Sequence, residues 1–166
     1  MLDCAERKPV VFGAEEGVSG ECLGAHCTTR LPEAATRGAV GMTELRVPPG
    51  AATPLHRHRN EDEILHVLEG SFRFWCGDWV RSAGAGATVV LPRGVPHAFR
   101  NVGAAPGRML EIVTPGGFER FFERCGALPP ETPKAERLAL GAEYGVEILG
   151  PPPAEPEPAE AAGVSC

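Results

Sequence analysis

The chain has 166 residues with a formal net charge of −6, which is enough length for one compact domain with a sizeable core. Its 16 lysines and arginines are scattered, which argues against nucleic acid and anionic membranes as partners and favours a small-molecule partner. The 21 glycines and 17 prolines favour turn-rich β structure over a helical bundle, and no apolar run approaches the roughly 20 residues of a membrane-spanning helix.

The first segment, residues 1–37, is expected to contain only short strands. Its beginning, MLDCAERKPVVFG, has neither an uninterrupted apolar stretch nor a small-residue cleavage site after one. It therefore does not look like a secretory signal, and a cytoplasmic location is expected. Weak strand candidates at 10–12 and 20–27 would extend the sheets or swap with a neighbouring chain.

From residue 40 to residue 113, short apolar runs alternate with turn residues, which is typical of a sandwich or barrel. The connections are too short for crossover helices, so the strands must be largely antiparallel. We therefore predict an all-β barrel over residues 38–116. Its strands are expected at 40–47, 55–58, 63–68, 72–75, 79–81, 88–91, 97–101 and 109–113.

Residues 117–146 are expected to form helices. In GFERFFERCG, four apolar side chains follow the i, i+3, i+4, i+7 spacing of an amphipathic helix that ends at Gly126 and covers or flanks the barrel: Phe118, Phe121, Phe122 and Cys125. A second helix is expected to begin with Thr132 as cap and Pro133 in its first turn, and to end at Gly145. The Pro-, Ala- and Glu-rich tail, residues 147–166, is expected to be disordered.

The six cysteines form no C-x-x-C pair, and no export signal supports a disulfide framework. Reduced thiols are therefore predicted for all of them: Cys4, Cys22, Cys27, Cys76, Cys125 and Cys166.

The stretch LHRH contains the first candidate metal ligands. If it is a strand, His56 and His58 point to one face, although by itself the pattern fits an exposed polar strand better. Glu63 follows a short turn and can bring its carboxylate back to the same point from the adjacent strand. His66 has the opposite parity and is expected outside the site.

The stretch GATVVLPRGVPHAFRN contains a further donor, His97. Pro92 ends one predicted strand, Gly94 turns the chain, and His97 begins the next. Taken alone, this could be an ordinary hairpin with a surface histidine.

Together the two stretches resemble the two-motif signature of the cupin superfamily. The first has Gly50, His56, His58, Glu63 and Gly70, separated by five, one, four and six residues; the second has Gly86, Pro92, Gly94, His97 and Asn101, separated by five, one, two and three. The segment after the barrel resembles that of bacterial quercetin 2,3-dioxygenase-like proteins. The resemblance implies a jelly-roll barrel, a homodimer, and a metal ion held by His56, His58, Glu63 and His97.

Such a donor set suits a catalytic ion. Three neutral imidazoles and one carboxylate neutralise half the charge of a divalent Fe, Ni, Mn, Co, Cu or Zn ion, which stays Lewis acidic. The absence of a thiolate argues against a purely structural zinc site. Glu63 is the candidate catalytic residue, because a detached carboxylate can act as general base. Glu61 and Asp62 are either hydrogen-bond partners of the imidazoles or part of a solvated turn.

The metal is expected to lie in an apolar cavity that favours an aromatic or enol-like substrate. Cys76 shares the parity of two lining candidates and would either line the cavity or fill the core. The expected lining is Leu45, Val47, Leu65, Val67, Phe72, Phe74, Phe99, and Met109 or Leu110.

Three functions fit these features. The first is a metal-dependent dioxygenase or other oxygenase. The second is a non-oxidative isomerase, decarboxylase or polyketide cyclase of a natural-product pathway. The second rests on the same residues as the first, so sequence alone does not exclude it. The third is a non-catalytic protein that binds a small molecule.

Overall fold

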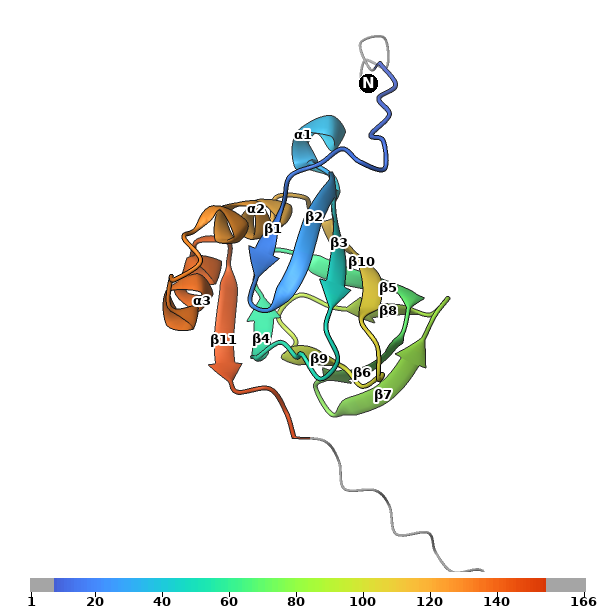
Figure 1. Cartoon of the computed structure of the whole chain (residues 1–166), viewed down its shortest axis with the longest axis vertical. Helices are drawn as coiled ribbons and strands as arrows, with labels where there is room; N and C mark the ends of the chain where they lie inside the picture. Colours follow the sequence, from blue (N-terminus) through green and yellow to red (C-terminus); the bar gives the residue numbers. More distant parts are fainter. Residues whose placement is uncertain (1–7, 155–166) are drawn as a thin grey trace, which may run out of the picture.

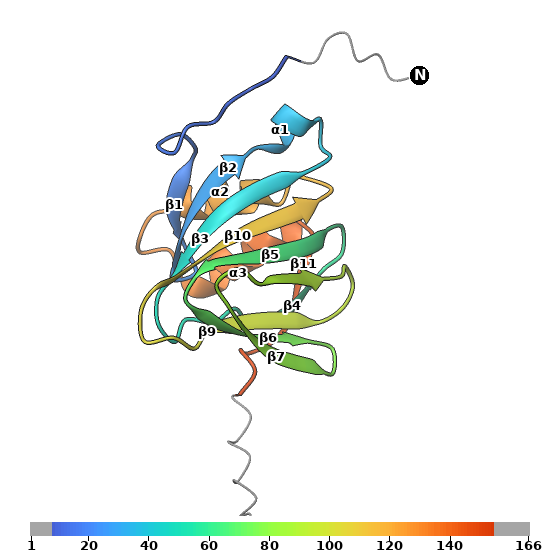
Figure 2. The same ribbon diagram turned by 90° about the vertical axis from the view of Figure 1, so that its right-hand side faces the viewer.

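The computed structural model describes residues 8–154, which form two antiparallel β-sheets packed face to face (Figures 1 and 2). The larger sheet has the strand order β1-β2-β3-β10-β5-β8 and the smaller one β11-β4-β9-β6-β7. The strands are β1 (Ser19–Cys22), β2 (Ala25–Leu31), β3 (Gly41–Val47), β4 (Leu55–His58), β5 (Asp62–Glu69), β6 (Ser71–Cys76), β7 (Trp79–Gly84), β8 (Thr88–Leu91), β9 (His97–Asn101), β10 (Gly107–Thr114) and β11 (Val146–Gly150). The predicted all-β barrel is confirmed.

The core lies between the two sheets. Along β5, buried and half-buried side chains alternate, so that one face of the strand enters the barrel. Leu65, Phe72, Phe74 and Met109 are fully buried there. Full burial of such a side chain stabilises the fold by about 1.5–3 kcal/mol relative to its exposure to water.

The eight strands expected between residues 40 and 113 are all present, with ends displaced by a few residues. The candidate at 20–27 is a hairpin, β1–β2, which turns at Leu23 and Gly24 and joins the larger sheet through β3. The candidate strand at 10–12 is wrong. Val10 and Val11 are exposed and have no neighbouring strand to which their backbone can bond, and the segment runs outside the sheets (Figure 1).

In the described part of the chain, three helices accompany the sheets: α1 (Glu33–Thr36), α2 (Glu119–Ala127) and α3 (Lys134–Glu143). The amphipathic stripe of α2 is confirmed, since Phe121 and Cys125 are buried. The expectation that Thr132 caps α3 is wrong: the cap position belongs to Pro133, and its carbonyl accepts bonds from the N–H groups of Glu136 and Arg137 at 3.0 and 3.2 Å.

The predicted boundary of the disordered tail, at residue 147, is wrong. Residues 147–150 belong to β11, which pairs with β4 and places Val146 opposite His58 and Ile148 opposite His56. Without β11, the backbone edge of β4 would be unpaired, and this pairing depends on a strand about ninety residues away that composition does not reveal. Residues 155–166 lie outside the described part of the chain.

The prediction of reduced thiols is wrong for two cysteines. Cys22 in β1 and Cys125 in α2 form a disulfide with Cα atoms 5.5 Å apart, a separation suited to the bond. They are 103 residues apart in the sequence, so only the docking of α2 on the hairpin brings them together. Within the described residues, Cys27 and Cys76 are free.

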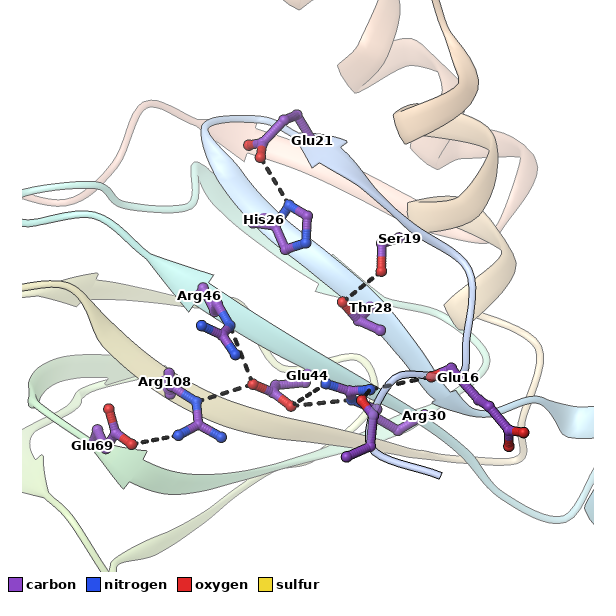
Figure 3. Close-up of polar contacts among 11 residues, drawn as sticks. Glu16, Ser19, Glu21, His26, Thr28, Arg30, Glu44, Arg46, Glu69 and Arg108 are labelled. Carbon is purple, nitrogen blue, oxygen red and sulfur yellow. Dashed lines mark hydrogen bonds and ion pairs between the residues drawn. The ribbon is translucent and has the colours of Figure 1, made fainter. Parts of the chain in front are cut away.

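The outward face of the larger sheet carries a charged network (Figure 3). Glu44 on β3 is buried beneath three guanidinium groups, of which Arg30 and Arg108 come from the neighbouring strands and Arg46 from β3 itself. Arg30 lies 3.0 Å from one carboxylate oxygen, and Arg108 and Arg46 lie 3.0 and 3.4 Å from the other. Arg108 also contacts Glu69. This network ties β2, β3, β10 and β5 together on the side away from the barrel interior.

Candidate metal centre

Two strands of the smaller sheet carry the three histidines. On β4, His56 and His58 are both buried while Leu55 and Arg57 are only half-buried, as strand alternation predicts. On β9, His97 stands directly opposite His56 in the register. The three imidazoles therefore enter the barrel together.

Glu63 reaches the histidines by a different route from the one expected. It lies on β5 in the larger sheet, between Leu91 of β8 and Val113 of β10, and not on a strand adjacent to β4. The turn after His58 carries the chain from one sheet to the other. The four donors consequently join both sheets across the barrel interior.

The donor atoms of the four side chains all lie within 4.8 Å of one another, and all four residues are buried. His97 Nε2 is 3.1 Å and His58 Nε2 is 4.0 Å from Glu63 Oε2. The ring centroids of His56 and His97 are 4.5 Å apart. The predicted ligands His56, His58, Glu63 and His97 are thus brought to one point.

The second ring nitrogen orients two of the three imidazoles. His56 Nδ1 lies 2.9 Å from the carbonyl oxygen of Pro54, and His97 Nδ1 lies 2.9 Å from that of Val95. A carbonyl oxygen only accepts, so each Nδ1 carries the proton and each Nε2 is left with its lone pair towards the cluster. This tautomer is the one that a metal requires.

The expected carboxylate partners of the imidazoles divide into two cases. Glu61 is buried beside His58, with Oε2 3.4 Å from Nδ1, but no hydrogen bond joins the two atoms. The Asp62 carboxylate instead pairs with the guanidinium of Arg93 at 2.9 Å on the protein surface. His66 hydrogen-bonds Thr88 at 2.8 Å on the outward face of the sheet and is outside the cluster, as predicted.

Several polar atoms in the cluster are buried without a hydrogen bond: His58 Nε2, His97 Nε2 and Glu63 Oε2. Leaving such groups unpaired costs about 1–3 kcal/mol each. A divalent cation satisfies all of them at once, because each has a lone pair directed to the shared point. The residues present therefore fit a metal ion held by three nitrogens and one carboxylate.

The charges at the cluster follow from the same geometry. Burial opposes ionisation of Glu63, but contact with His97 and the charges of His97 and His58 outweigh it and lower the pKa of Glu63. Burial and repulsion by His97 lower the pKa of His56 to about 4, so its imidazole is neutral. Burial also opposes the charged form of His97, but Glu63 reverses this effect and raises the pKa of His97.

Glu111 is a buried carboxylate of the site that the motif did not indicate. It lies on β10, where Met109, Glu111 and Val113 alternate inwards, and it borders the cavity beside Glu63. Burial and the nearby charge of Glu63 raise the pKa of Glu111. The parity of the predicted strand 109–113 contained the signal, because an acid at an inward position between apolar residues is unusual.

Three of the four donors, His56, His58 and Glu63, border a cavity of about 780 Å³, counting the open space at its mouth. Leu45, Val47 and Phe99 line it as predicted. The other expected lining residues do not border the cavity, because they fill the core or point outward: Leu65, Val67, Phe72, Phe74, Met109 and Leu110. Cys76 is also absent from the lining and is half-buried against the core.

Residues 51–54, between β3 and β4, also line the cavity, and segments outside residues 38–116 supply much of the remaining wall. They are the β1–β2 hairpin, α2, α3 and β11, which contribute Cys22, Leu23, Ala25, Phe118, Phe121, Phe122, Leu138, Val146 and Ile148. Among the described residues that line this cavity, none is Lys or Arg. The cavity therefore offers largely apolar walls, and its ionisable groups are the candidate ligands His56, His58 and Glu63 together with Glu111 and the Cys27 thiol.

Within residues 8–154, no helix has both the length and the apolar composition needed to cross a membrane.

Comparison with known proteins gives a consistent result. Residues 43–113 match the family model for the cupin domain. A germin-like protein 3-7 of Oryza sativa subsp. japonica is 30% identical over 118 residues, which cover 66% of this chain and 50% of that protein. Protein SchB of Streptomyces halstedii is 30% identical over 76 residues, covering 46% and 54%. The chain spans about half the length of these curated relatives.

Solved structures show the same fold. KdgF from Halomonas sp. superposes with a TM-score of 0.60 at 16% identity, covering 68% of this chain and 99% of that one. A predicted oxalate decarboxylase from Thermotoga maritima gives 0.58 at 21% identity, covering 63% and 98%. At these identities the likeness concerns the fold alone.

Proposed function

Because the chain contains a cupin domain and belongs to the cupin superfamily, we propose that it is a metal-dependent oxygenase acting on a small aromatic or enol-type substrate. The observation that supports the proposal is that a candidate metal site lies at the wall of a largely apolar cavity. A four-ligand cluster of three histidines and Glu63 opens into a cavity whose remaining walls are largely apolar. This pairing suits a substrate with an apolar body and one or two oxygen atoms that reach the metal.

A divalent transition metal held by His56, His58, Glu63 and His97 would supply Lewis acidity and, if redox-active, reactivity towards O2. The phenylalanines of α2 and Phe99 bind the apolar body of the substrate and exclude water. Glu63 accepts the proton of the enol or phenol hydroxyl, which leaves the electron-rich anion that reacts with O2.

The charge of the cavity favours this substrate class over a small dicarboxylate. A dianion such as oxalate, which appears in the name of one structural neighbour, would need cationic partners to offset its loss of hydration. Among the described lining residues there is no Lys or Arg, and two carboxylates, Glu63 and Glu111, face the cavity. An anionic substrate would have the metal as its only cationic partner there.

Two measurements test the proposal. Elemental analysis of protein purified without chelator identifies the metal, and iron or nickel would support oxygen chemistry. An oxygen electrode then follows the metal-loaded protein with flavonols, enediols and related phenols. Oxygen uptake that requires both metal and substrate supports the proposal. No uptake with any of these substrates contradicts it, and His66→Ala serves as a control variant outside the site.

The second candidate is non-oxidative proton transfer, as in an isomerase, a decarboxylase or a polyketide cyclase. The observation in its favour is that Glu63 and Glu111 are two buried carboxylates on the same cavity, which could deprotonate one substrate atom and protonate another. Turnover that persists without oxygen selects this candidate. Binding of a metabolite without any turnover would instead indicate a non-catalytic binding protein.

A further inference from the structure

One of the three histidine ligands lacks the hydrogen bond that orients the other two. The ring torsion of histidine is broad, so a metal-binding imidazole needs a partner to fix its rotation. His56 and His97 each have a carbonyl oxygen at 2.9 Å from Nδ1. For His58, the neighbouring atom is Glu61 Oε2 at 3.4 Å, too far for a well-formed bond, and Nδ1 is buried without a hydrogen bond.

An aromatic ring from outside the barrel lies against His58 instead. The centroid of the Phe118 ring is 4.4 Å from that of the imidazole, and the two planes are inclined by 76°. This edge-to-face arrangement is a favoured geometry for two rings, and rotation of His58 would break it. The His97 ring lies nearly parallel to His58, with centroids 5.4 Å apart, and limits rotation further.

Phe118 is itself held firmly. It stands at the start of α2, is 4% exposed, and stacks on Phe121 with centroids 5.2 Å apart. The carboxylate of Glu119 accepts bonds from the N–H groups of Gly117 at 2.8 Å and Glu33 at 2.6 Å, which fixes the beginning of α2 on α1.

The other end of α2 is fixed as well. Cys125 is bonded to Cys22, and the backbones of Gly126 and Gly20 approach so closely that a Cβ added to either glycine would lie 2.6–2.7 Å from the Cα atom of the other. The helix therefore holds Phe118 at a set position against the metal ligand, and the same ring lines the cavity.

We propose that Phe118 is a positioning residue for the metal centre: its ring sets the orientation of His58 and thereby couples the placement of α2 to metal coordination. The proposal concerns metal geometry and does not depend on which reaction the site catalyses. A substrate in the cavity would also contact Phe118, so that its binding would change the orientation of His58 and thereby the coordination of the metal.

The test compares Co(II) binding by full-length Phe118→Leu, Phe121→Leu and unmodified protein. Phe121 is a matched control, because it lies on the same helix, is 5% exposed and stacks on Phe118. Affinity is measured by competition with a chromophoric chelator, and geometry by the visible spectrum of bound Co(II). F118L should weaken Co(II) binding about 2- to 10-fold and shift the absorption bands. F121L keeps the Phe118 ring and removes only one of its supports, so it should lower the unfolding temperature and shift the bands less than F118L does.

Two further variants keep the proposal falsifiable. Phe118→Tyr retains the ring and should restore the spectrum of the unmodified protein. If F118L fails to fold, Phe118→Met, which fills a similar volume without a ring, takes its place in the comparison. A Co(II) affinity and spectrum in the ring-free variant equal to those of the unmodified protein would overturn the proposal. An equal spectral shift in F121L would also overturn it, since the effect would then belong to α2 as a whole.

Discussion

His56 on β4 and His97 on β9 face each other in register across the smaller sheet, with ring centroids 4.5 Å apart and planes inclined by 70°. The pair joins the two sequence motifs at one point, and neither histidine forms a site alone. Glu63 completes the cluster from the opposite sheet.

The first prediction concerns His97→Ala. The substitution removes one of four ligands while its neighbours stay in place, so metal affinity should fall by more than the roughly 10- to 100-fold that loss of an outer partner costs. Elemental analysis after dialysis measures the occupancy. His66→Ala, on the outward face of the sheet, should retain the metal. Equal occupancy in the two variants would refute the assignment of His97 as a ligand.

The second prediction separates the core from the cavity. Phe72 is fully buried beside Phe74 and does not border the cavity, whereas Phe122 is half-buried and lines it. Phe72→Ala should lower the free energy of unfolding by about 3–5 kcal/mol. Phe122→Ala should lower it less and weaken substrate or inhibitor binding more. Denaturant unfolding and a binding titration on both variants give the comparison, and equal loss of stability in both would contradict it.

The third prediction concerns the disulfide. Peptide mapping without reductant should recover the fragments with Cys22 and Cys125 linked, and those with Cys27 and Cys76 unlinked. The double variant Cys22→Ser/Cys125→Ser should lose about 2–5 kcal/mol of stability, because the bond closes a long loop. Thermal unfolding with and without reductant measures this loss. Cys76→Ser is the control, and reductant should lower its unfolding temperature as much as that of the unmodified protein. No effect of reductant on the unmodified protein would contradict the linkage.

The fourth prediction concerns acid stability through Glu44. Burial opposes its ionisation, but hydrogen bonds and charges from Arg108 and Arg30 outweigh burial and lower the pKa of Glu44 below its ordinary value of 4.5. A lowered folded-state pKa means that the carboxylate stabilises the fold fully above pH 4.5, and that this contribution is lost as the pH falls through the folded value. The network in Figure 3 then loses the negative charge between its arginines.

Glu44→Gln should therefore be less stable than the unmodified protein at neutral pH, and the gap should narrow as the pH falls below 4.5. Urea unfolding at a series of pH values measures both curves. Parallel curves across this range would show that Glu44 does not couple folding to proton binding. Glu143→Gln, an exposed residue that pairs with Arg124 away from this network, provides the control.

Much of the site was readable from local patterns. The alternation of a strand places His56 and His58 on one face, and the same alternation places His66 outside. The resemblance of the second motif to the cupin signature identified His97, and the helical stripe identified the apolar face of α2. Each of these inferences uses residues that are close together in the sequence, where backbone geometry alone relates one side chain to the next.

Other features depended on which segments become neighbours in space. Glu63 was expected on the strand adjacent to β4, yet it lies on β5 in the larger sheet and reaches the histidines across the barrel interior. The bond between Cys22 and Cys125 and the pairing of β11 with β4 join segments roughly ninety to a hundred residues apart. The parity of the predicted strand places Glu111 on the inward face, but parity does not show that this strand lies opposite the histidines. The predicted homodimer and the cytoplasmic location stay predictions.

The sequence by itself therefore determined the candidate metal ligands and the class of fold, because strand alternation and motif spacing are set by the covalent chain. Only the tertiary structure decided how the cavity is walled and how its ligands are oriented. The β1–β2 hairpin, α2, α3 and β11 close over the metal ligands because their apolar faces must be buried against something. The surface that buries them is formed only when the two sheets have packed, and it is there that Phe118 meets His58.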